Sequence, residues 1–188
     1  MQTPPEKVFD GRSYSIPLRY TKAQRIVALI ADRLMPIAAV LLPSNRLYTF
    51  LWRCLGVQVG QGSVIRLGTR INTPFMVKIG AASVIHGQLK ARGGVDIGNG
   101  VEFVEEVLVS TQSHNMDSAD FESVYAPVKI LDHAWIGPRA MVLSGITVGE
   151  GCAVGAGSVV TKDCPPWSVV AGVPARALKP RTPLRRPS

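Results

Sequence analysis

Aliphatic residues recur at every sixth position through most of the chain. The longest run is in phase without a break: Ile130, Ile136, Val142, Val148, Val154 and Val160. Shorter runs precede it: Val59, Ile65 and Ile71, then Ile79 and Ile85, then Ile97, Phe103 and Val109. This period matches neither an α-helix nor a half-buried strand, and it therefore predicts a solenoid of short repeats.

A six-residue repeat suits a coil with three flat faces, in which each repeat supplies a short strand and a turn. The aliphatic residue then points inward and stacks on its equivalents in the coils above and below. Glycine often follows it, as Gly137 follows Ile136, and we expect this glycine to permit backbone angles that a β-carbon resists. Small residues four positions after the aliphatic one, among them Cys152, fit near a corner, and Cys164 is given the same place.

The first 56 residues follow another pattern. Residues 1–20 are polar and predicted to be irregular, whereas residues 21–55 have helical spacing. Thr21 and Gln24 have the form of a capping box, and Pro36 should kink or end the first helix. A second helix is expected to start near Ser44 and to stop at Gly56. The expected apolar sides are Ile26, Leu29, Ile30 and Leu34 in the first helix and Leu47, Phe50, Leu51, Cys54 and Leu55 in the second.

Two interpretations of these helices stay open. They pack onto the end of the solenoid, or they form a basic amphipathic contact with a membrane, helped by Arg46 and Arg53. The apolar stretch from Ile26 to Leu42 is interrupted and short for a spanning helix. The predicted division is an extension at 1–56, the solenoid at 57–165 and a tail at 166–188.

Composition narrows the classes of partner. A net charge of +8 favours anionic partners, and a hydrophobic content of 46% excludes a disordered chain. The 3 cysteines, without close metal-ligand spacing, are interpreted as reduced thiols. With no secretory leader recognised at the N-terminus, the expected location is cytoplasmic, with peripheral attachment to the inner face of the membrane left open.

The repeat breaks between Ser113 and Pro127, where an external loop at 114–127 is predicted. Binding and catalytic residues are frequent on loops that a rigid scaffold positions. His114 lies at the root of this loop. It is the first candidate for chemistry in the chain.

At these residues the chain resembles the hexapeptide acyltransferases, and it is most similar to the sugar O-acetyltransferases that modify galactosides, maltose and exopolysaccharides. The stretches that carry the resemblance are 114–127, Ala134-Trp135-Ile136-Gly137, 144–149, 154–163 and 171–176. The resemblance implies an all-β fold: a left-handed parallel β-helix with an N-terminal helical segment and a short C-terminal tail. It also implies acetyl-CoA as the co-substrate and a homotrimer with its active sites between subunits.

The resemblance assigns roles to particular residues. His114 would be the general base that takes a proton from an acceptor hydroxyl. Glu122 would hold the imidazole, with Asp117 and Asp120 as alternative carboxylates. The acceptor-side candidates are His86, Asn115 and Asp117.

The CoA side is assigned in the same way. The pantetheine arm would lie near Trp135, Pro138 and Ala156, and a backbone N–H near Ser144 would stabilise the oxyanion. The nucleotide phosphates would meet Thr161, Lys162, Arg176 and Lys179, because phosphates favour cationic partners.

The predicted activity is acetyl transfer to a hydroxyl of a sugar or glycan, and a lipid-linked acceptor is left open. No nucleic acid is expected, because the basic tail lacks aromatic residues for stacking. N-acetylation of an amino sugar is an alternative, as is a non-catalytic scaffold. A zinc-dependent carbonic anhydrase would need three histidines, but His86, His114 and His133 occupy different places in their repeats, so no metal is expected.

Overall fold

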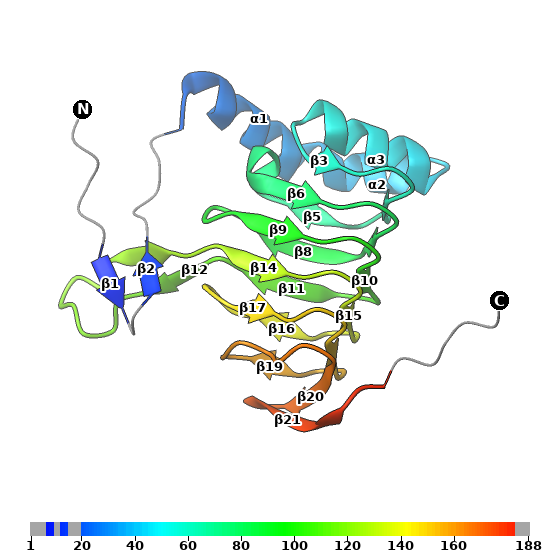
Figure 1. Cartoon of the computed structure of the whole chain (residues 1–188). Coiled ribbons are helices and arrows are strands. Elements are labelled where there is room, and N and C mark those ends of the chain that lie inside the picture. The colour runs from blue at the N-terminus through cyan, green and yellow to red at the C-terminus, as the bar shows by residue number, and fades with distance from the viewer. Residues whose placement is uncertain (1–6, 10–11, 15–19, 183–188) are drawn as a thin grey trace.

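The computed structural model describes residues 7–9, 12–14 and 20–182, and it confirms the parallel β-helix (Figure 1). Three parallel sheets form its faces. Face 1 contains β3 (Gln58–Val59), β6 (Val77–Ile79), β9 (Val95–Ile97), β14 (Val128–Ile130) and β17 (Thr147–Val148). Face 2 contains β4 (Val64–Ile65), β7 (Val84–Ile85), β10 (Glu102–Phe103), β15 (Trp135–Ile136), β18 (Ala153–Val154) and β20 (Ser168–Gly172). Face 3 contains β5 (Arg70–Ile71), β8 (Gly87–Lys90), β11 (Val107–Ser110), β16 (Met141–Val142) and β19 (Val159–Val160).

The strand register explains the six-residue period. On face 2, Ile136 pairs with Phe103 in the preceding coil and with Val154 in the next coil. Equivalent aliphatic residues therefore stack along the solenoid, and the six members of the longest run are all buried. The small residues at the corners, such as Ala140 and Cys152, are buried as well.

The glycines after the aliphatic residues are needed for a reason other than the one expected. Gly80 and Gly137 do not have positive φ values, so unusual backbone angles do not explain them. A β-carbon at Gly80 would lie 2.6 Å from the carbonyl carbon of Gly98, and one at Gly137 would lie 2.7 Å from the carbonyl oxygen of Val154. Close approach of successive coils at the corners therefore excludes a side chain there.

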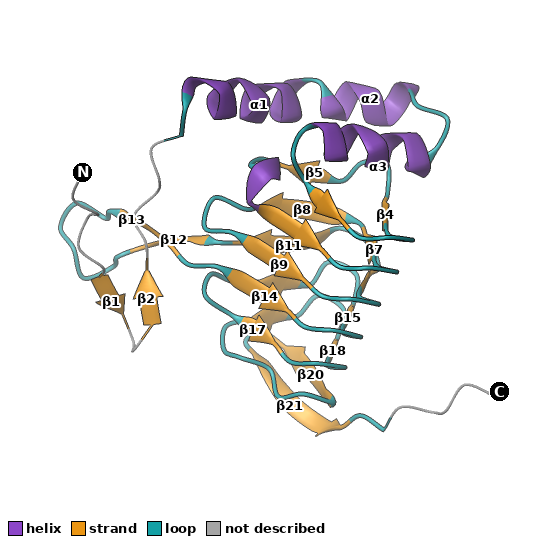
Figure 2. Cartoon of the chain, turned by 45° about the horizontal axis from the view of Figure 1, so that its top comes forward, coloured by secondary structure: helices purple, strands orange, loops and turns teal. Residues whose placement is uncertain are grey.

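Three helices cover the first coil: α1 (Lys22–Arg33), α2 (Met35–Leu41) and α3 (Asn45–Cys54) (Figure 2). The capping box of Thr21 and Gln24 is confirmed. Pro36 lies in the first turn of α2, just after the break at Leu34. Ser44 caps α3 through its side chain, and Gly56, with φ of +100°, follows its end.

Buried hydrogen bonds join α3 to the first coil. The hydroxyl of Tyr48 donates to the carbonyl of Thr69 (2.6 Å). Thr49 Oγ1 accepts from the N–H of Ile65 (2.9 Å), and Asn45 Oδ1 accepts from the N–H of Leu67 (2.8 Å). These contacts complete the solenoid at this end, as the packing interpretation of the helices requires.

The predicted apolar sides of the helices match the buried sides only in part. Ala31 and Met35 are buried in α1 and α2, whereas the predicted Ile26, Leu29 and Leu34 are exposed. In α3 the buried residues are Tyr48, Thr49 and Trp52, whereas Leu47 and Phe50 are exposed. Leu51 and Leu55, which were also predicted for α3, do pack against the core. The helices carry apolar residues on two sides, and helical spacing alone did not separate the two.

Both ends of the chain differ from expectation. Within residues 1–20, β1 (Lys7–Phe9) and β2 (Arg12–Tyr14) form an antiparallel pair, so the prediction of irregular structure was wrong there. The remainder of residues 1–19 lies outside the described residues. The solenoid continues past position 165, because β20 pairs parallel with β18, and β21 (Ala175–Pro180) then turns back antiparallel along β20. Arg185 and Arg186 lie outside the described residues.

Among the residues that the structure describes, no helix is both long enough and apolar enough to cross a membrane.

Candidate functional site

The turns between strands form three edges of the prism, which we number by the faces they join. The first edge joins faces 1 and 2 and includes His133. The second joins faces 2 and 3 and includes His86, Pro138 and Ala156. The third joins face 3 back to face 1 and includes Ser144.

A two-stranded arm leaves the third edge between β11 and β14. Its strands β12 (Gln112–His114) and β13 (Ser123–Tyr125) pair antiparallel, with His114 opposite Ser123. The predicted external loop is therefore an ordered hairpin with a tip at 115–122. Main-chain pairing along its length sets the position of His114.

Hydrogen bonds at the root tie the arm to the solenoid. The N–H of Ala126 donates to the carbonyl of Thr111 (3.0 Å) and so closes the hairpin. The Ser144 hydroxyl in the next coil donates to the same carbonyl (3.0 Å) and lies 3.2 Å from the Ala126 nitrogen. A β-carbon at Gly93 would lie 3.0 Å from backbone atoms of Thr111 and Ala126, so only glycine leaves room for this root without a shift.

The imidazole of His114 is oriented by a main-chain group. Its Nδ1 lies 2.6 Å from the carbonyl oxygen of Phe121. A carbonyl only accepts hydrogen bonds, so Nδ1 carries the proton and Nε2 of the neutral ring has a free lone pair. Phe121 adopts the left-handed conformation (φ +44°), which is uncommon for a bulky residue and is typical of functional sites.

The tip of the arm is held by Asn115 and Glu122. The N–H of Asn115 donates to the carbonyl of Glu122 (2.9 Å), and its side-chain amide donates to Glu122 Oε1 (3.2 Å). Asn115 Oδ1 accepts from the N–H of Asp117 (3.1 Å). The Asn115 amide therefore stabilises the turn, while Asp117 is exposed at the tip.

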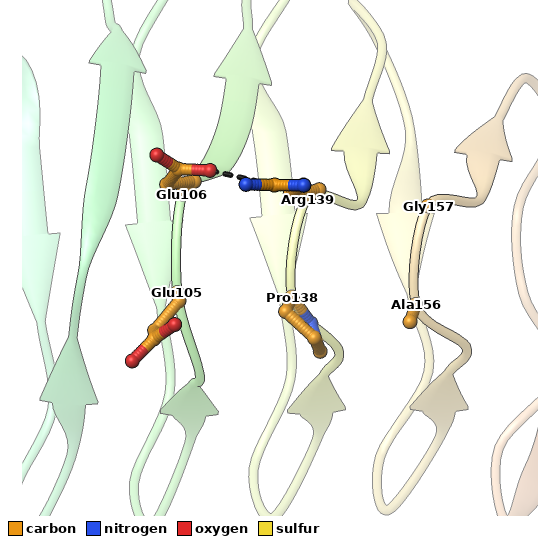
Figure 3. Close-up of a pocket in the computed structure, with 6 residues that line it drawn as sticks. All are labelled: Glu105, Glu106, Pro138, Arg139, Ala156 and Gly157. Atoms are coloured by element: carbon orange, nitrogen blue, oxygen red, sulfur yellow. Dashed lines mark hydrogen bonds and ion pairs between the residues drawn. The ribbon is translucent and has the colours of Figure 1, made fainter.

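A hollow of about 420 Å³ lies on the second edge and is drawn in Figure 3. Successive coils supply its lining from two rows of equivalent positions: Glu105, Pro138 and Ala156 in one, Glu106, Arg139 and Gly157 in the other. Main-chain bonds connect the coils here, from the N–H of Arg139 to the carbonyl of Glu105 and from the N–H of Gly157 to the carbonyl of Pro138 (2.8 and 2.9 Å). Glu106 and Arg139 form an ion pair of 2.7 Å at one end.

The second row shows how the hollow stays open. Glu106, Arg139 and Gly157 all have positive φ, between +51° and +64°. The first two project side chains from this turn, whereas Gly157 has none, and no atom lies within 4 Å of where its β-carbon would be. The surface beside Ala156 is therefore free of side chains at Gly157, and we call this open surface the shelf.

Within one chain, the predicted site residues lie on different edges of the prism. Pro138 and Ala156 lie together at the hollow of the second edge. His114 and Ser144 belong to the third edge, and Thr161 and Lys162 occupy the same edge one coil further on. Face 3 lies between these two groups.

The other predicted residues lie on face 2 or its edges. Trp135, half-buried, is in β15. Arg176 and Lys179 are exposed on β21, and His86 Nδ1 is 3.3 Å from the Val104 carbonyl at the second edge. The three histidines therefore lie at three different edges, and the described residues contain no group of three metal-ligating side chains.

Sequence reasoning missed Phe121, Thr111 and Gly93. Phe121 and Thr111 act through main-chain carbonyls, and any residue type has such a group, so its side chain carries no signal. A positive φ at a phenylalanine is likewise absent from the pattern of residues. Gly93 is the exception of the three, because a glycine outside the six-residue phase is visible in the sequence.

Comparisons with known proteins agree with this architecture. Residues 127–162 match the family model described as bacterial transferase hexapeptide (six repeats). The chain is 30% identical over 134 residues to the putative colanic acid biosynthesis acetyltransferase WcaF of Escherichia coli K12, which covers 70% of this chain and 74% of the relative. The chain belongs to the hexapeptide-repeat acetyltransferase family.

Two further similarities concern named activities. Over 88 residues the chain is 36% identical to the galactoside O-acetyltransferase of Escherichia coli K12; the match covers 45% of this chain and 43% of that relative. The chain thus spans less than half the length of this relative. A hexapeptide-repeat acetyltransferase from Vibrio cholerae, solved in complex with acetyl-CoA, superposes with a TM-score of 0.69 and 25% identity over 86% of this chain and 89% of that one.

Proposed function

We propose that this protein transfers the acetyl group of acetyl-CoA to a hydroxyl of a sugar or glycan, with His114 as the general base. The observation that carries the proposal is the bond between His114 Nδ1 and the Phe121 carbonyl. That bond selects the tautomer in which Nε2 can accept a proton, and the exposed position of His114 leaves room for an acceptor. Membership of an acetyltransferase family supports the choice of acetyl donor.

The imidazole then performs two proton transfers. Nε2 takes the proton of the acceptor hydroxyl while the oxygen attacks the thioester carbonyl, and a tetrahedral oxyanion forms. The carbon–sulfur bond breaks, the ester is released, and Nε2–H gives its proton to the departing CoA sulfur. The Phe121 carbonyl keeps accepting from Nδ1 throughout and so holds the imidazole in place, which is the role that the resemblance gave to a carboxylate such as Glu122.

The active site is proposed to need two copies of the chain. The arm with His114 is on the third edge, whereas the hollow at Pro138 and Ala156 is on the second edge. In a homotrimer, the arm of one subunit can lie against the second edge of its neighbour. Met116 and Phe121 are exposed apolar residues of the arm, and burial against a neighbour would remove them from water.

The hollow is the proposed seat of the pantetheine arm of acetyl-CoA. Pro138 and Ala156 offer apolar contact, and the shelf at Gly157 admits a chain without a steric barrier. Lys162, Arg176 and Lys179 are exposed cations that could meet the phosphates. As part of the same proposal, Trp135 and Thr161 contact CoA and His86 contacts the acceptor. A backbone N–H near Ser144 stabilises the oxyanion.

The variant His114→Asn tests the proposal, because asparagine can still donate to the Phe121 carbonyl but cannot act as a base. We expect acetyl transfer, read as released thiol, to fall by about 10²–10⁴-fold. CoA binding by calorimetry should change little. The matched control is His133→Asn, on the first edge, which should keep the wild-type rate.

A wild-type rate in His114→Asn would refute the assignment of the base. The acceptor class is tested by parallel assays with hydroxyl sugars and with amino sugars. Turnover only with the amino sugars would replace O-acetylation by N-acetylation. A monomer in sedimentation that retains full activity would refute the shared site.

A further inference from the structure

The outer side of α1 and α2 is an exposed apolar stripe. The two helices meet end to end at Leu34, whose N–H donates to the carbonyl of Ile30 in α1 and whose carbonyl accepts from the N–H of Ala38 in α2. The side opposite the buried Ala31 and Met35 is exposed along both helices. It carries Ile26, Leu29, Ile37 and Val40, with exposed fractions of 58%, 58%, 55% and 84%.

The helix α3 has an exposed apolar side of its own. Its inner side holds Tyr48 and Trp52 against the first coil, and its outer side presents Leu47 and Phe50, the latter 57% exposed. α1 packs against β5, α3 packs against β4, and both helices lie across the same end of the prism (Figures 1 and 2). We call the six outward residues the helical patch: Ile26, Leu29, Ile37, Val40, Leu47 and Phe50.

Basic residues accompany the patch. Residues 22–54 contain five cations, Lys22, Arg25, Arg33, Arg46 and Arg53, and a single acid, Asp32. Lys22 and Arg25 belong to the outer side of α1, one turn before Ile26 and Leu29. An apolar strip with cations along it is the pattern of helices that lie in the interface of an anionic bilayer.

We propose that the helical patch binds the surface of a membrane that contains anionic lipids. The apolar side chains would enter the boundary between headgroups and acyl chains, while Lys22, Arg25 and Arg46 would meet lipid phosphates. The helices would lie parallel to the bilayer plane, since α1 and α2 have 12 and 7 residues and are too short to span it. The prism would then stand with its first coil toward the bilayer.

Charge favours lipid over a second copy of the chain as the occupant. Arg53 donates to the carbonyls of Val59 and Gly60, and Arg33 lies 3.9 Å from Asp32. Two copies joined through the patch would still bring Lys22, Arg25 and Arg46 of each chain together, and their like charges would repel. Anionic headgroups instead supply the opposite charge at the rim. Exposed apolar patches on soluble proteins often mark sites that bind a partner.

Co-sedimentation with vesicles tests the proposal on the full-length protein. We expect the bound fraction to rise at least about 10-fold when phosphatidylcholine vesicles are replaced by vesicles with phosphatidylglycerol, and to fall as salt is raised. The double variant Leu29→Ser with Val40→Ser should remove most of this binding. The double variant Lys22→Gln with Arg25→Gln should weaken it on phosphatidylglycerol vesicles only.

Matched controls lie on the solenoid. Lys78→Gln with Lys129→Gln removes two exposed cations of face 1, and Leu131→Ser removes an exposed leucine of the first edge. Both should bind vesicles as the wild type does. Acetyl transfer to a water-soluble acceptor is measured for every variant as a check of folding, and it separates this proposal from the proposed function.

Three outcomes would overturn the proposal. The protein sediments with neither kind of vesicle, or it binds neutral and anionic vesicles equally. In the third outcome, the wild-type protein sediments as an assembly larger than its active form, and the variant Leu29→Ser with Val40→Ser does not form this assembly. A second copy of the chain is then the occupant of the helical patch.

Discussion

Ile136 and Ile37 are the same residue type in two regular apolar patterns, yet Ile136 is fully buried and Ile37 is 55% exposed. In the solenoid, each aliphatic position has an equivalent one coil above and one below, so the pattern creates its own partner. On the helices, the apolar stripe of α1 and α2 has no equivalent, because the first coil already contacts the opposite side. A regular apolar pattern therefore predicts burial only where the fold repeats along it.

The largest expected effect is in the core of the solenoid. Ile136→Ala should lower the free energy of unfolding by about 2–5 kcal/mol, because it leaves a cavity between Phe103 and Val154. Urea unfolding at fixed protein concentration measures this change. A loss below that range would mean that the coils collapse around the vacancy and that stacking is weaker than the register indicates.

An intermediate effect is expected where α3 joins the first coil. Thr49→Val keeps the shape of the side chain but leaves the buried N–H of Ile65 without its acceptor. We expect a loss of about 1–3 kcal/mol in the free energy of unfolding. Thr182→Val, at an exposed position, is the control and should unfold as the wild type does. Equal stability of the two variants would show that the helices cover the coil without supporting it.

The smallest effect is expected on the helical patch. Ile37→Ala should change the free energy of unfolding by no more than about 0.5 kcal/mol, in contrast to the same substitution at Ile136. Thermal unfolding of both variants side by side makes this comparison. A destabilisation of Ile37→Ala as large as that of Ile136→Ala would mean that a protein partner already buries the patch in solution.

The proposed active site shows a similar division. His114 could be identified from the break in the repeat, and Pro138 and Ala156 came from the resemblance and line the same hollow. The Phe121 carbonyl could not be foreseen, because it reaches His114 only through the hairpin pairing and a positive φ. The separation of the arm and the hollow on two edges likewise follows from how three faces close into a prism.

The sequence by itself determined the solenoid, its core and the caps of its helices, because these depend on local spacing and on contacts between neighbouring repeats. Only the tertiary structure decided which side of α1, α2 and α3 is buried, because both sides are apolar and the choice depends on the shape of the first coil. It also decided why glycine is required at positions 80 and 137, where the absence of a side chain makes room for the adjacent coil. The tautomer of His114 was decided in the same way, by a main-chain atom seven residues away.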